Sequence, residues 1–429
     1  DAIYDEQADT MVQSSALLRD TYESIKTLDD GTPDGRLRSR LCKLIFLIGK
    51  LPAQGIAATG VRATADTLAD LLVEDLTAGS GALRQRPPAL LQDLVESNAL
   101  MLVDGQYRLQ TPIGKEWHDD YQQRLAKIRN DAGRIASDRD GALREALGGV
   151  FGKVKPTHGI EKTPRRVEPS YGQAPPPADS GAVPVWVRDG WSVAEGEVRL
   201  AAQTAGDESP IVFVFLPRRD SDALRDALAG YAAARECIDQ RPAPVAAEGV
   251  EAKGNMDTKR NLAQQAVRAH AQEIVANARV YQGGGNEIAL GDASADALQQ
   301  ALTTGVEAAL ARLFPKFSQA DQKGWDKVFD RATQGAADSL NAAGYTGDVA
   351  NNPVCQAVNA YAGPAGKRGS EIRRQFTGAP YGWPQDAVDG ALAALAAAGL
   401  VRALRNGVAV PVKGLNRGQV PGTDFYTDV

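Results

Sequence analysis

Residues 384–410 read PQDAVDGALAALAAAGLVRALRNGVAV, and this stretch decides the fold class that we expect. Its first half has apolar residues at helical spacing, and Gly399 is a typical residue for the end of a helix. Its second half is a pair of short apolar segments around Asn406-Gly407, which predicts a β-hairpin. Two shorter helical patterns precede it after residue 353. Three helices followed by a hairpin is the order of a winged-helix domain, and we expect the tail at 414–429 to fray.

The same order of patterns occurs nearer the start of the chain. Apolar residues recur at helical spacing over 37–48, and Thr64 is a candidate N-cap for a second helix. A third helix is expected to begin at Pro87, because proline is favoured in the first helical turn. Two apolar segments then flank Asp104-Gly105 and predict a second hairpin. The pattern therefore predicts a second winged-helix domain.

The middle of the chain has a different character. Residues 211–216 read IVFVFL, a bounded apolar run that predicts a buried strand, and a helical pattern follows at 220–238. Alternation of strands and helices indicates a small α/β layer. Prolines are frequent over 155–182, which we expect to be an extended or mobile linker. We therefore predict an α+β, mostly helical chain with these parts: a helical lead-in (1–35), a winged helix (36–129), a helix and Pro-rich linker (130–184), an α/β and helical middle domain (185–345), and a second winged helix (353–420).

Composition limits the classes of function. The chain has 429 residues and a formal net charge of −6, which excludes a globally basic nucleic-acid coat. Its three cysteines are far apart, so neither a disulfide framework nor a CxxC metal site is expected. Each lies in a helical pattern and is expected to be a buried small side chain. We expect a reducing, cytoplasmic setting and no transmembrane helix. Because the chain opens at Asp1 without a methionine, we expect a fragment.

No catalytic motif emerges from the sequence. A phosphate-binding loop needs G-x-x-x-x-G-K-[ST], whose backbone amides wrap the phosphates. The nearest stretch, Gly363-Pro-Ala-Gly366-Lys367-Arg368, has Tyr361 at the first glycine position and Arg368 at the Ser/Thr position. We interpret it as a basic turn between two helices. No H-E-x-x-H zinc motif occurs, and we predict neither catalytic nor metal-binding residues.

Nucleic-acid contact is the chemistry that the charge pattern favours most. Residues 353–420 contain eight basic and three acidic residues, a net charge of +5, whereas the rest of the chain carries −11. A locally basic unit in an acidic chain is typical of a phosphate-binding surface. We expect Asp386 and Asp389 to face outward on the third helix, which argues against base reading. The candidate phosphate-contacting residues are Lys367, Arg368, Arg373, Arg374, Arg402 and Arg405.

Two further interpretations stay open. The basic unit is equally compatible with an acidic protein partner or with another part of the same protein. Arg218-Arg219 follows the apolar run at 211–216, and the carboxyl ends of strands often hold ligands in α/β sheets. The alternative for this pair is ordinary solvated side chains.

Several stretches resemble the BrxC/PglY family of bacteriophage exclusion (BREX) defence systems. They are DAIYDE at 1–6, LIFLIGKLP at 44–52, YRLQTPIGKEW at 107–117, VWVRDGW at 185–191, IVFVFLPR at 211–218 and RLFP at 312–315. Members are large proteins with an AAA+-type P-loop ATPase region. Because that motif is missing here, the resemblance implies the region that follows the ATPase. ATP and Mg²⁺ would then belong to the full-length protein, and no ATP-site residue is transferred to this chain.

The resemblance implies phage defence, with other BREX components as partners and DNA as the ultimate substrate. The leading hypothesis is a non-catalytic assembly and DNA-contact region of such an ATPase. It predicts salt-sensitive, sequence-indifferent DNA binding that weakens when Arg368, Arg373 and Arg374 become alanine. The alternative is a protein-interaction scaffold with no direct DNA binding. No membrane association is expected under either hypothesis.

Overall fold

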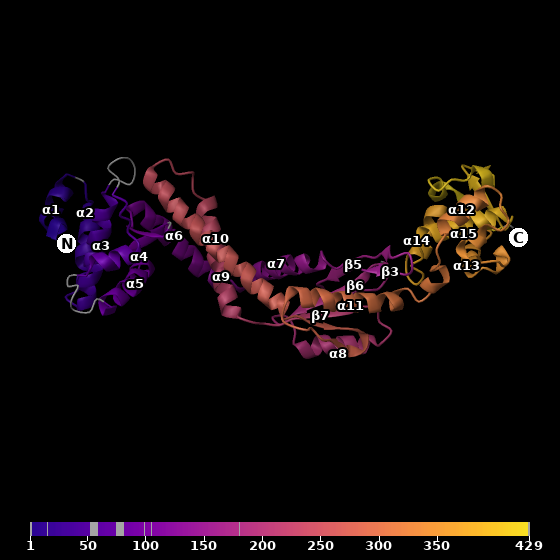
Figure 1. The fold of residues 1–429 in the computed structure, drawn as a ribbon, viewed down its shortest axis with the longest axis horizontal. Coiled ribbons are helices and arrows are strands. Elements are labelled where there is room, and N and C mark those ends of the chain that lie inside the picture. The colour runs from indigo at the N-terminus through magenta and orange to yellow at the C-terminus, as the bar shows by residue number, and fades with distance from the viewer. Residues whose placement is uncertain are drawn as a thin grey trace. The chain divides into compact units, whose positions relative to one another are not determined.

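The computed structural model describes residues 2–14, 16–51, 59–73, 81–97, 99–103, 105–179 and 181–427. It has the α+β, mostly helical composition that the sequence predicts. The chain divides into two compact units, each made of two segments: unit 1 is Asp1–Asp140 with Asp222–Arg268, and unit 2 is Gly141–Ser221 with Ala269–Val429. Figure 1 labels the elements of both units along the chain. Every helix in the described ranges is too short or too polar to cross a membrane.

Unit 1 is built mainly from helices. Three of them start at a threonine whose hydroxyl accepts the backbone N–H three residues on: Thr32, Thr64 and Thr111. These caps satisfy amides that the first helical turn leaves unpaired. Its elements are α1 (Ala2–Gln13), α2 (Arg19–Thr27), α3 (Pro33–Gly49), α4 (Ala65–Leu71), α5 (Gly81–Glu96), β1 (Leu100–Val103), β2 (Gln106–Leu109), α6 (Pro112–Arg129), α9 (Ser221–Asp239) and the first parts of α7 (Ala132–Phe151) and α10 (Ala247–Ala276).

The N-terminal prediction of three helices and a hairpin matches the element order from α3 to β2. Strands β1 and β2 pair antiparallel, with Leu100 opposite Leu109, and Gly105 adopts a φ of 75° in the turn. Asp104, the other predicted turn residue, lies outside the described residues. The third helix begins at Gly81 rather than at Pro87, so the proline pair lies inside it. The prediction of a helix at the proline pair is therefore confirmed, but the prediction that the helix begins at Pro87 is wrong.

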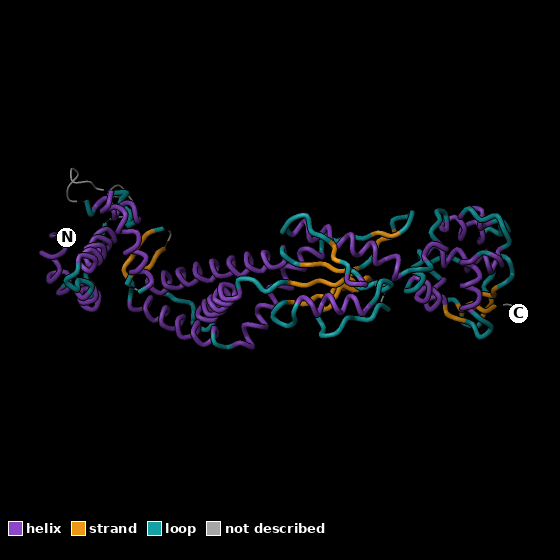
Figure 2. The backbone as a smooth tube through the Cα atoms, turned by 90° about the horizontal axis from the view of Figure 1, so that it is seen from below, coloured by secondary structure: helices purple, strands orange, loops and turns teal. Residues whose placement is uncertain are grey.

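Unit 2 holds a five-stranded sheet in the order β5-β6-β7-β8-β9. Strands β5 to β7 are parallel, and β8 and β9 are antiparallel to their neighbours. All five residues of β7 are buried, which confirms the strand predicted from IVFVFL. Phe213 and Phe215 pack with Val198 of α8 on one face, whereas Val212 meets Gly305 of α11 on the other. The elements are β5 (Val167–Ser170), β6 (Val183–Asp189), α8 (Glu195–Ala205), β7 (Val212–Leu216), β8 (Arg279–Tyr281), β9 (Glu287–Ile288) and α11 (Ala295–Leu313). Figure 2 shows these strands with helices around them.

The segment at 155–182, expected to be an extended or mobile linker, contains short extended strands. It contains β3 (Thr157–His158) and β4 (Thr163–Pro164), which pair with each other, and it contains β5. Strand β5 is the edge strand of the sheet and runs parallel to β6. An edge strand tolerates Pro169, because a proline there need not break a ladder on its free side. Residues 167–170 of the expected linker are therefore part of the sheet, whereas Pro175, Pro176 and Pro177 lie outside its strands.

The C-terminal part of unit 2 combines helices with a four-stranded sheet in the order β10-β13-β11-β12. Asn406 and Gly407 both have positive φ, at 52° and 77°, as a two-residue type I′ hairpin requires. This confirms the hairpin predicted around Asn-Gly. The elements are α12 (Trp325–Thr333), α13 (Pro353–Ala362), β10 (Lys367–Arg368), α14 (Gly369–Thr377), α15 (Gln385–Ala397), β11 (Val401–Arg405), β12 (Val408–Ala409) and β13 (Asp424–Thr427).

Two expectations for this region are wrong. The tail was expected to fray, yet β13 lies between β10 and β11 and its Phe425 is fully buried. The tail lacks periodicity because β13 is only four residues long, so its pairing depends on strands far away in the sequence. Asp389 was expected to face outward, yet it is 1% exposed. A charged side chain on a helix usually faces solvent, but residues 387–395 of α15 are all buried by neighbouring elements.

Candidate nucleic-acid interface

The predicted phosphate-contacting residues lie on and beside the small C-terminal sheet. Lys367 and Arg368 form β10 at one edge, and Arg402 and Arg405 lie on β11. All four are exposed. Arg374 is exposed on α14, the helix that follows β10 directly. We call these five residues the basic set: Lys367, Arg368, Arg374, Arg402 and Arg405.

The strand register places two members of the basic set on one face of the sheet. Arg368 lies opposite Asp424 of β13, and Arg402 lies opposite Tyr426. Since Asp424 and Tyr426 are two residues apart, both arginines face the same side. They are two strands apart, roughly 10 Å across the sheet. The half-buried carboxylate of Asp424 lies on this face between them, so the face is basic with one acidic group at its centre.

Arg373 does not belong to this surface. Its guanidinium donates to both carboxylate oxygens of Asp389, at 2.8 and 2.7 Å, and to the carbonyl of Arg417. Burial raises the pKa of the Asp389 carboxyl, and the Arg373 guanidinium opposes that rise. The pair is an internal ion pair of unit 2, so we remove Arg373 from the phosphate-contacting candidates.

Internal pairing engages two arginines of 353–420 that lie outside the basic set. Arg417 pairs with Asp330 and Asp386, as Arg373 pairs with Asp389. Two of the three acidic residues at 353–420 are thus occupied by arginines of the same region. The exposed charges of 353–420 are the acidic residues Glu371 and Asp386 and six basic residues, the basic set and Lys413. Among the described residues, Arg368, Arg374 and Arg405 enter no ion pair.

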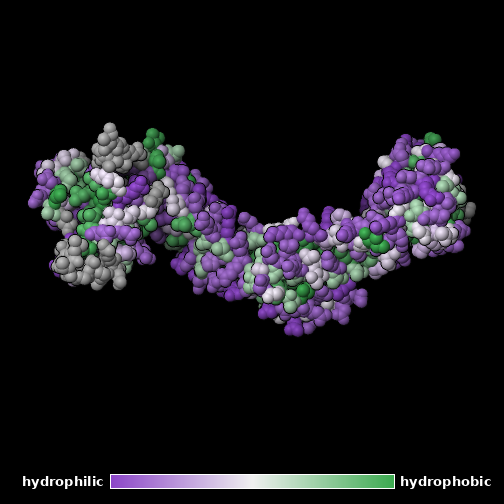
Figure 3. Space-filling model, viewed as in Figure 1, coloured by the Kyte–Doolittle hydropathy of each residue, from purple (hydrophilic) through white to green (hydrophobic). Residues whose placement is uncertain are grey.

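Helix α15 is the third helix of the predicted three-helix order, and it is too buried to enter a DNA groove. Residues 387–395 are all buried, and α12 and α13 pack against it. Its exposed side chains at the N-terminal end are Gln385 and Asp386. A helix must present several side chains to base edges to read sequence. The buried helix therefore leaves the exposed basic set as the only predicted phosphate-contacting residues of this region that are accessible to a ligand. The face that Figure 3 shows of this region, at the right, is mostly hydrophilic.

The stretch that resembles a phosphate loop is a turn that leads into β10. Gly363 and Gly366 both have positive φ, at 59° and 75°. A Cβ at Gly366 would lie 2.2 Å from the ring of Tyr426, so a side chain there would displace that ring. The glycines therefore serve a tight turn under an aromatic ring, and the interpretation as a basic turn accounts for them.

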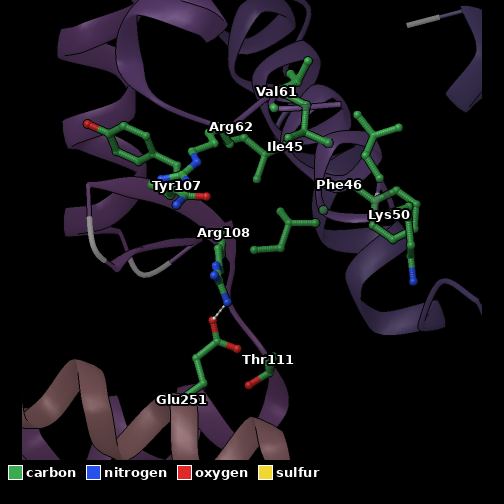
Figure 4. A pocket seen from close by; sticks show the side chains of 16 residues that line it. Ile45, Phe46, Lys50, Val61, Arg62, Tyr107, Arg108, Thr111 and Glu251 are labelled. Atoms are coloured by element: carbon green, nitrogen blue, oxygen red, sulfur yellow. Dashed lines mark hydrogen bonds and ion pairs between the residues drawn. The ribbon is translucent and has the colours of Figure 1, made fainter. Parts of the chain in front are cut away.

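A hollow in unit 1 has a volume of about 740 Å³. Figure 4 shows Ile45 and Val61 on its apolar side and the ion pair of Arg108 with Glu251, 2.6 Å, on its polar side. Leu51 and Gly60 also line it, and residues 52–58 between them lie outside the described residues. We assign no ligand to this hollow.

The comparisons bear on the identity of the chain. No family model, no curated protein and no solved structure matches it. The proposal for its function therefore rests on the residues and geometry of the chain itself.

Proposed function

We propose that this chain is a non-catalytic assembly and DNA-contact region of a BREX-type AAA+ ATPase that acts in the cytoplasm. In this proposal, residues 36–129 and 353–420 are winged-helix domains. The second one contacts DNA phosphates through the basic set without reading bases. ATP and Mg²⁺ are bound elsewhere in the full-length protein, and other BREX components are its protein partners.

One observation carries the DNA part of the proposal. Unit 2 pairs Asp386 and Asp389 with its own arginines, and six basic side chains are exposed at 353–420 against Glu371 and Asp386. Arg368, Arg374 and Arg405 enter no ion pair among the described residues. Exposed basic side chains of this kind attract phosphates and release counterions when they bind. The acidic remainder of the chain would keep such binding local to this unit.

The test is a fluorescence-anisotropy titration of labelled duplex DNA at several salt concentrations. We expect affinity to fall steeply with salt and to be equal for unrelated sequences. The triple variant Arg368→Ala, Arg374→Ala and Arg405→Ala should bind more weakly and lower the salt slope by about 3, since each phosphate contact contributes about 1. Arg373 is left intact because its loss would perturb the fold.

A matched control separates local contact from net charge. Arg199, Lys323 and Lys327 are exposed in unit 2 and enter no ion pair among the described residues. Their triple alanine variant also removes three positive charges, from positions outside the basic set. Equal weakening by both triple variants, or unchanged binding in the first, would contradict the assignment of the basic set.

The second candidate function is a protein-interaction scaffold. The burial of α15 favours it, because the helix that most DNA-binding winged helices use for reading is covered here. This hypothesis predicts no DNA binding even at low salt, together with a stable complex when the chain is co-expressed with the other BREX components. Size-exclusion chromatography of the co-expressed proteins measures that complex. DNA binding lost in the triple variant would exclude a pure scaffold.

A further inference from the structure

A group of metal-ligating side chains lies in unit 2, at the edge where its parallel strands end. Strand β7 ends at Leu216, and the following loop reaches Asp220. The last turns of α10 bring His270 and Glu273 to the same place, and these two residues are three apart on the helix. Residues at this spacing lie side by side on one helix face. One ligand atom from each of Asp220, His270 and Glu273 lies within 4.8 Å of the other two.

The three side chains are not explained by internal pairing. Within the described part of the chain, no hydrogen bond or ion pair engages the side chains of Asp220, His270 or Glu273. Arg219, the residue before Asp220, donates to Asn277 Oδ1 at 2.5 Å and to neither carboxylate. Two exposed carboxylates thus lie close together without a cationic partner, and a cation bound between them would be attracted to both.

The backbone of the loop contributes to this arrangement. Asp220 adopts a φ of 40°, which is uncommon for a residue with a side chain. The Arg219–Asn277 hydrogen bond ties the loop to the end of α10. Asp220 is therefore held beside the helix by a contact that does not use its own carboxylate, and the carboxylate stays available to a ligand.

We propose that Asp220, His270 and Glu273 bind one divalent first-row transition metal ion, for which Zn²⁺ is the probe. An imidazole with two carboxylates is a ligand set that suits such ions better than Mg²⁺ or Ca²⁺, which prefer oxygen alone. At Zn²⁺ bond lengths of about 2.0–2.2 Å, ligand atoms lie about 3.4 Å apart, so small side-chain rotations close the site. Asp220 and Glu273 are exposed and His270 is half-buried, which leaves the remaining coordination positions to water.

The test is isothermal titration of ZnCl₂ into the untagged full chain, without DNA. We expect one saturable equivalent per chain in the wild type. The separate variants Asp220→Asn, His270→Gln and Glu273→Gln should each weaken binding at least about tenfold, because each removes one ligand from a three-ligand site. Since all three positions are at the surface, circular dichroism should show unchanged folding.

Two control variants make the result specific. Glu248→Gln changes an exposed carboxylate on the same helix, and His118→Gln changes a histidine of unit 1. Both should bind Zn²⁺ as the wild type does. The proposal is overturned if the wild type shows no saturable binding, or if the control and ligand variants weaken binding equally. Because no nucleic acid is present, this outcome is independent of the DNA-binding test.

Discussion

Two consecutive arginines of α14 show how position decides the role of a residue. Arg373 points inward and donates two hydrogen bonds to the buried carboxylate of Asp389, whereas Arg374 is exposed. The sequence cannot distinguish them, because both are arginines in a basic stretch. The distinction depends on α15, which supplies the buried Asp389 from sixteen residues away.

This pair leads to a prediction about stability. Arg373→Ala should destabilise unit 2 by roughly 3–5 kcal/mol, because it leaves the carboxylate of Asp389 buried without a partner. Arg374→Ala should change the free energy of unfolding by less than about 0.5 kcal/mol. Urea denaturation followed by circular dichroism measures both. Similar losses for the two variants would show that the ion pair does not stabilise the fold.

His158 is a second residue whose surroundings set its chemistry. Its ring stacks on Phe317 with centroids 3.8 Å apart, and Arg165 lies over Phe314 and Phe317. Burial and the positive charge of Arg165 lower the pKa of His158, although Asp321 acts in the opposite direction. The folded protein therefore disfavours the charged imidazolium.

A pH dependence follows from the lowered pKa. Because the unfolded chain binds this proton more readily, the stability of unit 2 should fall as pH drops below about 6.5, the ordinary histidine value. His158→Phe keeps a stacking ring and removes the titration, so its stability should depend less on pH between about 7.5 and 5. Urea unfolding at several pH values checks this. Parallel curves for wild type and variant would contradict it.

At the scale of elements, short sequence signals predicted the β-hairpins. They did not predict which strands distant in the sequence pair with one another. Asn406-Gly407 predicts its own turn, because the two positive φ angles depend on these two residues alone. Strand β13 carries no comparable signal, yet it pairs with both β10 and β11. The sequence likewise did not predict the proline-containing strand β5, because its strand conformation depends on pairing with β6.

One glycine substitution tests the Asn406-Gly407 turn, and a second, in a helix, is its control. Gly407→Ala should destabilise unit 2 by about 1 kcal/mol, because alanine disfavours the φ of 77° although nothing lies within 4 Å of the new Cβ. Gly254→Ala, in the middle of α10 with equally open surroundings, should stabilise unit 1 by about 0.5–1 kcal/mol. Thermal unfolding midpoints should therefore move in opposite directions. Shifts of the same sign would argue against the left-handed turn.

At the scale of the whole molecule, the chain forms two units whose segments alternate in the sequence. Residues 222–268 belong with the first 140 residues, whereas the sequence analysis assigned them to a continuous middle domain. Helices α7 and α10 each run from one unit into the other. A long helix has one continuous pattern, so its sequence does not mark where its packing partners change.

The three cysteines are distributed over both units and can be used to follow the unfolding of each. Cys42 and Cys237 belong to unit 1 and Cys355 to unit 2, and all three are fully buried, as the sequence predicted. Burial raises the pKa of each thiol to about 12. At pH 8 about one thiol in 10⁴ is then ionised, and the thiolate is the reactive form.

Thiol labelling with Ellman's reagent tests this arrangement. The native protein should show no fast-reacting thiol, and the fully unfolded chain should show three. In rising urea, Cys355 should react with the unfolding of unit 2, and Cys42 and Cys237 should react together with unit 1. Single Cys→Ala variants assign each signal. A rapidly labelled thiol in the native protein would contradict the burial of that residue.

The sequence by itself determined the local features of this protein. Helical periodicity, the Thr64 cap, the Asn406-Gly407 turn and the buried strand within IVFVFL each depend on neighbours a few residues away, so the pattern predicts them. Tertiary structure alone decided the pairing of β13, the inward position of Asp389, the loss of Arg373 from the basic surface and the meeting of Asp220 with His270 and Glu273. Those features depend on segments far apart in the chain, and a linear pattern does not record which of them come together.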